Sequence, residues 1–406
     1  MDRLFSKIDK FRDEMVETQI RLTSIPALGP QNGGDGEKEK ADYVKSLLGS
    51  IGFDRIEEYK APDLRVSCGY RPNIVAILYG ENRRKTVWIL THLDIVPPGS
   101  RELWRTDPFK AEVKNGKIYG RGVEDNQQEM VASIYAVKAL KELKIRPKYN
   151  VGLAFVSDEE TGSRYGVEYL LSQDIFKKED IIIAPDGGNS KGTMIEVAEK
   201  SLLWLKFTVK GKQFHASVPQ KAKNASRIGS QFLLRLDKVL HKRFRKENPL
   251  FTPPVSTFEP TRREENVPNV NTIPGQDIFY FDCRILPEYP LKEVIGFIKR
   301  ETKEAEREFK VKIKLEEVMT TPAPPPTPED AEVVKLLKSS IKAVYGVRAR
   351  ARGIGGGTVA AFFRKAGYDA VVWSKIDGTA HQPNEYCVIK NMVDDAKVYL
   401  HLLTRP

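Results

Sequence analysis

The residues of this sequence best suited to chemistry are histidines and carboxylates that directly follow apolar runs. The run Thr86–Leu90 predicts a buried strand, and His92-Leu93-Asp94 follows it, with the breaker Pro97-Pro98-Gly99 close behind. Side chains alternate along a strand, so His92 and Asp94 are expected on one face. The carboxylate could then hold the imidazole and leave its other nitrogen free for a metal. A His-x-Asp triplet alone is equally consistent with a surface histidine that is hydrogen-bonded to a neighbouring aspartate.

Two further strand ends and two loops bring the same residue types to comparable places. An acidic turn, Asp158-Glu159-Glu160, follows the apolar run Tyr149–Val156, and Asp186 follows a run ending at Ala184. An acidic turn capping a helix is the alternative for the first of these. Five ligands of oxygen or imidazole type, with no thiolate, suit two divalent ions that share one carboxylate, and zinc is the ion we expect. A sixth residue, an acid, is then left for proton transfer. The candidates are His92, Asp125, Glu159, Glu160, Asp186 and His381.

The elements around these residues predict an α/β domain with a mostly parallel sheet sandwiched by helices. Strands are expected at 55–60, 73–79, 86–90, 149–156, 180–184 and 370–374, and they alternate with helices near 37–50, 126–143, 165–172, 329–344 and 359–366. Residues 1–29 predict an amphipathic helix, and Asn115-Gly116 predicts a hairpin turn. The carboxyl ends of parallel strands share one edge, so the candidate residues can converge there.

The pattern changes between residues 198 and 320. Two helices and four strands follow one another there as β-α-β-β-α-β, which is the order of a ferredoxin-like sandwich. A proline-rich connector, 320–328, then leads back. We therefore predict two domains, one made of residues 1–197 and 321–406 and a smaller α+β domain of residues 198–320 inserted into it.

Composition narrows the classes of function. A chain of 406 residues with 40% hydrophobic and 30% charged residues is typical of a soluble two-domain protein. Three widely spaced cysteines argue against a disulfide framework and against a cysteine-based zinc site. The net charge of +11 lies in helices of mixed sign, so nucleic-acid binding is not expected. No apolar run approaches the roughly 20 residues that cross a bilayer, and no secretion signal begins the chain, which predicts a cytoplasmic protein without a membrane partner.

Six ordered motifs give the sequence a family resemblance that extends over about residues 10 to 400. The motifs are His92-Leu-Asp94, Gly120-Arg-Gly-Val-Glu-Asp125, Asp158-Glu-Glu-Thr-Gly162, Pro185-Asp-Gly-Gly188, Gly355-Gly-Gly-Thr358 and His381-Gln-Pro-Asn-Glu-Tyr386. In this order, with an inserted segment before the last two, they resemble the dinuclear zinc hydrolases. That family includes succinyl-diaminopimelate desuccinylase, acetylornithine deacetylase, aminoacylase-1, glutamate carboxypeptidase and carnosinase.

The resemblance implies a role for each candidate. His92, Asp125 and Asp186 would hold one metal, and Asp125, Glu160 and His381 the other. Asp94 would support His92, and Glu159 would be the general base, which takes a proton from a metal-activated water and passes it to the leaving amine. Two zinc ions per chain are expected, with cobalt or manganese as alternatives.

The inserted domain would act as a lid and as the surface of a homodimer. His215, in a segment that resembles the family's lid histidine, would stabilise the oxyanion. A histidine between a strand and a proline turn is, without the resemblance, more simply loop structure. Asn271 and Arg284 match positions that grip a substrate carboxylate, and the glycine-rich loop would offer backbone N–H groups to the same anion. The residues expected in that loop are Gly356, Gly357 and Thr358.

Departures from the family pattern shift the expected substrate. The ligand at Asp186 is glutamate in most desuccinylases and deacylases and aspartate in dipeptidases, which favours a short peptide or an N-acyl amino acid. The loop Ser374–Gly378 lacks a common Gly-Pro-Gly turn, and Val359 stands where an aspartate is common. The alternatives are a biosynthetic N-succinyl-diaminopimelate desuccinylase or acetylornithine deacetylase and, from another class, a non-catalytic metal- or peptide-binding relative.

Overall fold

The computed structural model describes residues 2–405 and divides the chain into two compact units. Unit 1 contains residues 2–197, 326–352 and 358–405, and unit 2 contains residues 198–325 and 353–357. The short segment 353–357 belongs to unit 2, although the predicted boundaries placed it in the larger domain. The assignment of unit 1 as a catalytic domain and of unit 2 as a lid stays a prediction.

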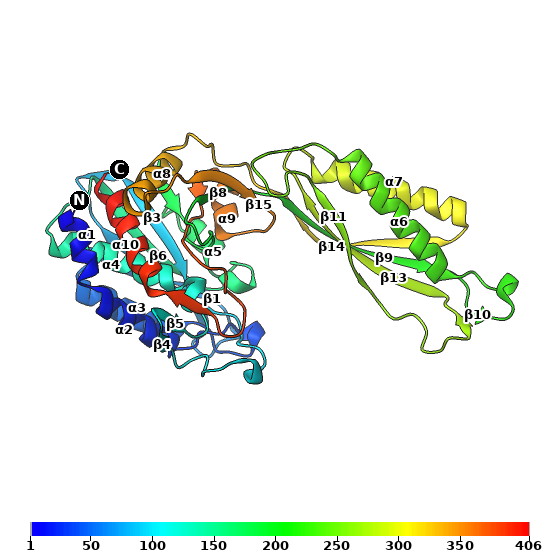
Figure 1. Ribbon diagram of the computed structural model, residues 1–406, viewed down its shortest axis with the longest axis horizontal. Coiled ribbons are helices and arrows are strands. Elements are labelled where there is room, and N and C mark those ends of the chain that lie inside the picture. The colour runs from blue at the N-terminus through cyan, green and yellow to red at the C-terminus, as the bar shows by residue number, and fades with distance from the viewer. Residues whose placement is uncertain (1, 406) are drawn as a thin grey trace. The chain divides into compact units, whose positions relative to one another are not determined.

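Unit 1 is built on a six-stranded sheet in the order β1-β2-β6-β3-β7-β16 (Figure 1). The four strands from β6 to β16 are mutually parallel, whereas β2 pairs antiparallel with β6 and with the edge strand β1. The strands are β1 (Arg55–Pro62), β2 (Tyr70–Leu78), β3 (Asn82–His92), β6 (Tyr149–Val156), β7 (Ile181–Ile183) and β16 (Ala370–Val371). The predicted α/β class is confirmed, with the sheet parallel at its centre and on the side of β16.

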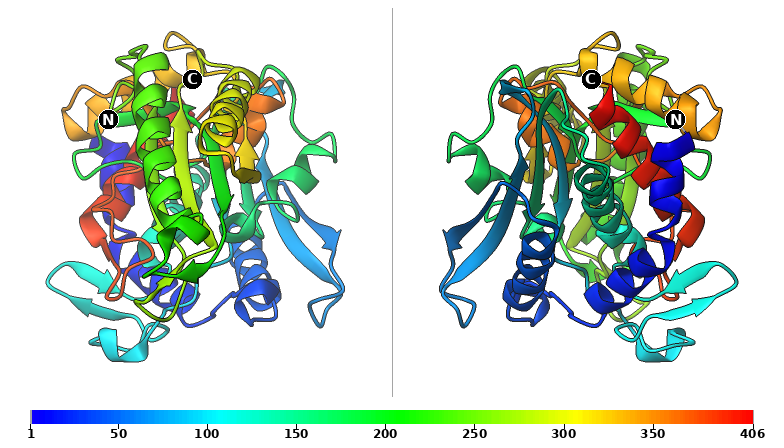
Figure 2. Two further views of the ribbon diagram at one scale, coloured as in Figure 1. Left: turned by 90° about the vertical axis from the view of Figure 1, so that its right-hand side faces the viewer. Right: turned by 90° about the vertical axis from the view of Figure 1, so that its left-hand side faces the viewer.

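Helices cover both faces of this sheet. The side chains of Trp88 and Leu90 pack with helices α5 and α9 in a buried cluster, and α4 packs on the opposite face with α10 beside it (Figures 1 and 2). The helices of unit 1 are α1 (Asp2–Asp9), α2 (Arg12–Thr23), α3 (Lys38–Ile51), α4 (Gln128–Glu142), α5 (Val167–Leu171), α8 (Glu332–Tyr345), α9 (Val359–Lys365) and α10 (Ile389–Thr404). The predicted N-terminal helix is therefore two helices, with a break between Asp9 and Arg12.

Small strand pairs complete unit 1. The predicted hairpin is present as β4 (Glu112–Lys114) and β5 (Lys117–Tyr119), and Asn115 and Gly116 take left-handed conformations with φ of 51° and 73°. Strand β17 (Tyr386–Val388) adds to β5. The unit boundary falls within β8 (Met194–Glu199) and β15 (Arg350–Ile354), a pair of strands that the sequence pattern did not predict.

Unit 2 is an antiparallel sheet in the order β11-β13-β9-β14 with α6 and α7 side by side on one face (Figure 2). This order is that of the predicted ferredoxin-like sandwich, and phenylalanines of β9, β13 and α6 form its core. Its elements are β9 (Ser201–Lys210), β10 (Phe214–His215), α6 (Ala225–Arg243), β11 (Thr257–Arg263), β12 (Thr272–Ile273), β13 (Gln276–Ile285), α7 (Leu291–Phe309) and β14 (Lys312–Thr321).

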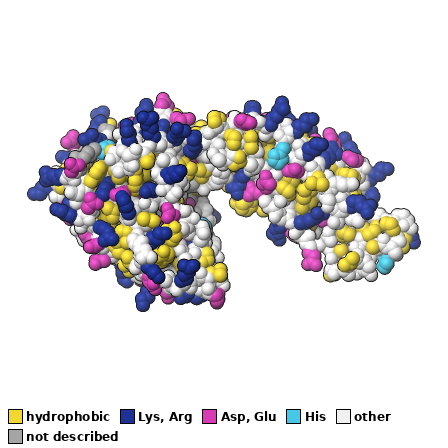
Figure 3. Space-filling model, viewed as in Figure 1, with side chains coloured by type: hydrophobic (Ala, Val, Ile, Leu, Met, Phe, Trp, Pro, Cys, Tyr) yellow, Lys and Arg dark blue, Asp and Glu magenta, His cyan; other side chains and the backbone are white. Residues whose placement is uncertain are grey.

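The surface seen in Figure 3 carries lysine and arginine side chains spread over both units and interspersed with acidic ones. The excess positive charge is thus not gathered into one patch on this face. Among residues 2–405, no helix is long and apolar enough to cross a membrane.

Candidate metal centre

The histidine and the acids that follow the parallel strands meet at one edge of the unit 1 sheet. His92 is the last residue of β3, Glu159 and Glu160 lie in a single 3-10 turn (Glu159–Thr161) after β6, and Asp186 follows β7. Strands β6, β3 and β7 are neighbours, so their carboxyl ends bring these side chains together. Nε2 of His92 lies 3.5 Å from Oδ1 of Asp186.

Asp125 lies between two histidines that are 289 positions apart in the chain. Its Oδ1 is 2.9 Å from Nε2 of His92, and its Oδ2 is 3.0 Å from Nε2 of His381. Nε2 of His381 is also 3.0 Å from Oε2 of Glu160. Each oxygen of this one carboxylate therefore faces a different histidine, which is the arrangement expected of a bridging ligand.

Two overlapping groups of side chains are placed to hold a cation. His92, Glu159 and Asp186 form one, and His92, Asp125 and Glu160 form the other; in each group the ligand atoms lie within 4.8 Å of one another. Glu159, predicted as the general base, is thus also close enough to His92 and Asp186 to share a cation with them. The donors are carboxylate oxygens and imidazole nitrogens, a set that suits zinc, cobalt or manganese.

The electrostatics of this cluster call for added positive charge. Burial and the neighbouring Asp186 carboxylate raise the pKa of Glu159 well above its usual range. Burial lowers the pKa of His92, but the carboxylates of Asp186 and Asp125 outweigh burial and raise it well above its ordinary value. Hydrogen bonds to Asp125 and Glu160 raise the pKa of His381 to about 10. All three shifts favour the protonated form, and a divalent cation would compete with those protons for the same atoms.

Asp94 supports the cluster through both its backbone and its side chain. Nδ1 of His92 lies 2.9 Å from the backbone carbonyl oxygen of Asp94, whereas its distance to Oδ1 of Asp94 is 3.6 Å. The carboxylate instead accepts the backbone N–H groups of Glu159 and Glu160, at 3.1 and 3.0 Å. The carbonyl thus orients the imidazole, and the side chain holds the turn that carries the two glutamates.

Other side chains hold the cluster together, and the search for strand-end ligands did not single them out. Asn126 accepts the backbone N–H of His92 at 3.2 Å and donates to Oδ1 of Asp186, also at 3.2 Å. Glu37, which is paired with the buried Arg71, accepts the N–H of Asp158 at 3.3 Å. Glu124 binds the loop of His381, and Glu385 binds the segment of Asp125. Both glutamates lie inside motifs quoted above, so the motifs contained a signal for them.

The site residues predicted in unit 2 form two separate pairs. His215 on β10 is exposed, and the strand pairing sets it beside Thr272, next to Asn271. Arg284 lies near the other end of β13, where its guanidinium contacts Asp282 at 2.6 Å and donates to the carbonyl oxygen of Gly355 at 2.7 Å. Gly355 precedes Gly356 and Gly357 in unit 2, whereas Thr358 is the first residue of the next segment of unit 1.

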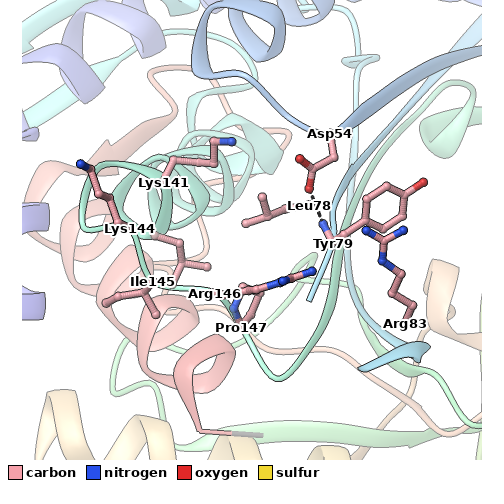
Figure 4. Close-up of a pocket in the computed structure, with 10 residues that line it drawn as sticks. Asp54, Leu78, Tyr79, Arg83, Lys141, Lys144, Ile145, Arg146 and Pro147 are labelled. Carbon is pink, nitrogen blue, oxygen red and sulfur yellow. Dashed lines mark hydrogen bonds between the residues drawn. The ribbon is translucent and has the colours of Figure 1, made fainter. Parts of the chain in front are cut away.

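A hollow of about 290 Å³ at the other end of α4 is distinct from this cluster (Figure 4). Lys141, Lys144 and Arg146 line it, together with Asp54, which accepts the backbone N–H of Tyr79 at 2.7 Å. Asp125 precedes the first turn of α4, and a helix of this length spans about 22 Å. The hollow therefore plays no part in the proposed chemistry.

Comparison with known proteins identifies the family. Residues 88–405 match the model of "Peptidase family M20/M25/M40". A metallohydrolase of Methanocaldococcus jannaschii, described as uncharacterized, is 44% identical, and the alignment covers 96% of this chain and 99% of that protein. A succinyl-diaminopimelate desuccinylase of Wolinella succinogenes is 25% identical over 97% of this chain and 100% of its own length.

A solved structure shows the same fold over nearly the whole chain. Human carnosine dipeptidase 1 superposes with a TM-score of 0.74 at 19% identity, and the match covers 99% of this chain and 98% of the dipeptidase. The family resemblance noted in the sequence is thus confirmed. The chain is a metallohydrolase of the peptidase family M20/M25/M40.

Proposed function

We propose that this metallohydrolase uses two divalent cations to cleave an amide bond in a small substrate with a free carboxylate. Zinc is the cation that we expect. The substrate class is a short peptide or an N-acyl amino acid. One observation carries the proposal: the two oxygens of Asp125 face different histidines, His92 and His381. We assign Asp186 to the cation at His92 and Glu160 to the cation at His381, with Asp125 shared between them.

Glu159 is the residue that we propose to move protons. Bound cations would lower the pKa of a water molecule and polarise the scissile carbonyl. Glu159 lies beside His92 and Asp186, where its carboxylate could take a proton from such a water and return it to the leaving amine. Asp94 acts indirectly, because its carboxylate holds the backbone N–H groups of the turn that carries Glu159.

Unit 2 supplies the residues that we propose to recognise the substrate. Arg284 points a planar guanidinium at the glycine-rich loop, a geometry suited to a carboxylate. We assign His215 to the developing oxyanion and Asn271 to the substrate beside it. About eight residues of β13 separate Arg284 from the end that adjoins β12, or about 26 Å of extended strand.

That separation favours a homodimer. A small substrate cannot touch Arg284 and His215 of the same copy of unit 2, because Arg284 lies near one end of β13 and His215 lies on the β10-β12 pair beyond the other end. We therefore propose that His215 acts on substrate bound to a second copy of the chain, and that the copies associate through unit 2.

A second candidate is a biosynthetic N-succinyl-diaminopimelate desuccinylase or an acetylornithine deacetylase. The desuccinylase of Wolinella succinogenes aligns with the whole chain, and this observation favours the former. The aspartate at position 186 favours peptide-like substrates instead.

Assay of the purified, metal-loaded protein against dipeptides, N-acetyl amino acids and N-succinyl amino acids would decide among these candidates. We expect hydrolysis of dipeptides or N-acyl amino acids that carry a free carboxylate, and little with the corresponding amides. Activity on N-succinyl-diaminopimelate alone would support the second candidate. Two bound metals without turnover of any substrate would identify a non-catalytic relative and overturn the proposal.

A further inference from the structure

Two buried glutamates tie the segment of Asp125 to the loop of His381, and each comes from the segment that the other binds. Glu124, which is 4% exposed, reaches into the loop before His381. Its Oε1 accepts the backbone N–H of Asp377 at 2.7 Å, and its Oε2 accepts the backbone N–H groups of Thr379 and, at 3.1 Å, of Ala380. The hydroxyl of Thr379 also donates to Oε2, at 2.8 Å.

Glu385 makes the reciprocal set of contacts. It lies four residues after His381 and is fully buried. Its Oε1 accepts the backbone N–H groups of Glu124 and Asp125, at 2.9 and 3.1 Å. Its Oε2 accepts the N–H of Gly122 at 3.0 Å and Nη1 of Arg121 at 2.6 Å. Three hydrogen bonds thus fix the backbone that leads into Asp125, and the fourth binds the side chain of Arg121.

These contacts matter because neither Asp125 nor His381 has the backbone of a regular helix or strand. The side chain of His381 is 54% exposed, and its backbone is left-handed with φ of 62°, a conformation that costs a non-glycine residue free energy. Asp125 has non-helical dihedral angles of −112° and 93° at the entrance to α4. Close packing does not fix the side chain of His381, and a regular helix does not fix Asp125. The two glutamates instead hold the backbone of each segment through hydrogen bonds.

We propose that Glu124 and Glu385 are positioning residues that set the distance between Asp125 and His381 and thereby the affinity of the site formed by Asp125, Glu160 and His381 for its cation. This inference rests on the proposed function. Neither glutamate is assigned as a ligand. Each acts through backbone N–H groups, and a carboxylate is suited to this because it accepts through both oxygens and never donates.

The isosteric variants Glu124→Gln and Glu385→Gln test the charge and keep the shape. In either orientation, the amide would direct an NH2 group at N–H donors that the carboxylate now accepts. The loops would then separate, and we expect the cation at Asp125, Glu160 and His381 to bind about 10- to 100-fold less tightly, as is typical when groups that orient metal ligands are lost. Glu124→Asp keeps the charge and should recover part of the affinity.

Asp180→Asn is the matched control. Asp180 is also a buried acceptor, of the N–H groups of Thr86 and Lys177 and of the indole of Trp88, but it lies before β7, at the end of that strand opposite Asp186. This variant should lower the melting temperature of the metal-free protein as the glutamine variants do. Both of its metals should keep wild-type affinity.

The measurements are metal affinity by competition with a chelator, the visible absorption of the cobalt-loaded protein, and the melting temperature of the metal-free form. We expect the glutamine variants alone to lose affinity at one site and to alter the cobalt spectrum. Wild-type affinity at both sites in Glu124→Gln and Glu385→Gln, or an equal loss in Asp180→Asn, would overturn the inference. Fewer than two metals in the wild-type protein would instead refute the proposed function, before any variant is made.

Discussion

At the scale of single residues, the centre separates three jobs among chemically similar carboxylates by what each one touches. Asp125 contacts two histidines, Asp94 accepts two backbone N–H groups, and Glu159 lies beside His92 and Asp186. Burial and Asp186 raise the pKa of Glu159, so it binds a proton more readily than an ordinary glutamate does. Its place beside the proposed cation ligands puts this carboxylate within reach of a water that the cations would activate.

Glu159→Gln should therefore impair turnover much more than metal binding. We expect kcat to fall by about 10²- to 10⁴-fold, the usual contribution of a general base, while two metals per chain remain bound. Steady-state kinetics on the best substrate and elemental analysis of the same preparation would check this. A variant that loses one metal along with its activity would make Glu159 a ligand, as its place in the first cation group allows.

At the scale of elements, the contact between α4 and α10 contains a second acidic pair, remote from solvent. Glu129 and Asp395 are buried within hydrogen-bonding reach of each other, and two tyrosines, Tyr399 and Tyr345, donate to them. Burial and this mutual contact raise the pKa of Asp395 well above its ordinary value, and burial also raises that of Glu129. The folded protein thus holds a proton here that the unfolded chain releases near pH 4.

The sign of the resulting pH dependence follows from this difference. A carboxyl group whose pKa is raised by folding stabilises the native state fully below its unfolded pKa, and this contribution is lost as pH rises through the folded pKa. Wild-type protein should lose stability on going from pH 5 to pH 9, by about 1.4 kcal/mol for each pH unit over which the extra proton is held. Glu129→Gln removes one acid of the pair.

We expect the free energy of unfolding of Glu129→Gln, relative to wild type, to increase steadily over that range. Urea unfolding of the metal-free proteins at several pH values would measure it. Glu142→Gln, at the partly exposed end of the same helix, is the control and should leave the shape of the curve unchanged. A wild-type curve parallel to that of Glu129→Gln would show that the pair does not share a proton.

Elements with a strong local pattern were predictable, and those defined by distant contacts were not. The hairpin at Asn115-Gly116 and the two long helices of unit 2 have local signals, namely a turn that favours positive φ and an apolar stripe. Strands β8 and β15 are short and gain their hydrogen bonds from each other across about 150 residues, so no window of sequence shows them.

The candidate site divides in the same way. Position at a strand end indicated His92 from its pattern alone, whereas the convergence of Asp125 and His381 on it, which the structure shows, was predicted from the family resemblance. The roles of Glu124 and Glu385 depend on backbone N–H groups more than 250 positions away, and a pattern of side chains contains no record of such partners. Asp94 was predicted to support His92 through its carboxylate, which lies 3.6 Å from Nδ1; the carbonyl oxygen of the same residue is nearer, at 2.9 Å.

At the scale of the whole molecule, all the proposed metal ligands belong to unit 1, and unit 2 has a hydrophobic core of its own. A cation that binds only the folded state stabilises it by RT ln(1 + [L]/Kd), about 4.1 kcal/mol at a thousand times Kd. Removal of metal should consequently loosen unit 1 and leave the core strands of unit 2 as protected as before.

Hydrogen exchange on the intact chain, with and without a chelator, separates the two units peptide by peptide. We expect the amides of β3, β6 and α4 to exchange faster after metal removal, because the carboxylates around Asp125 then repel one another without a cation between them. Amides of β9 and β13 should keep their rates, since neither strand carries a proposed ligand. Equal acceleration in both units would show that metal binding stabilises the chain as one cooperative body, and no change in unit 1 would argue against a cation at Asp125.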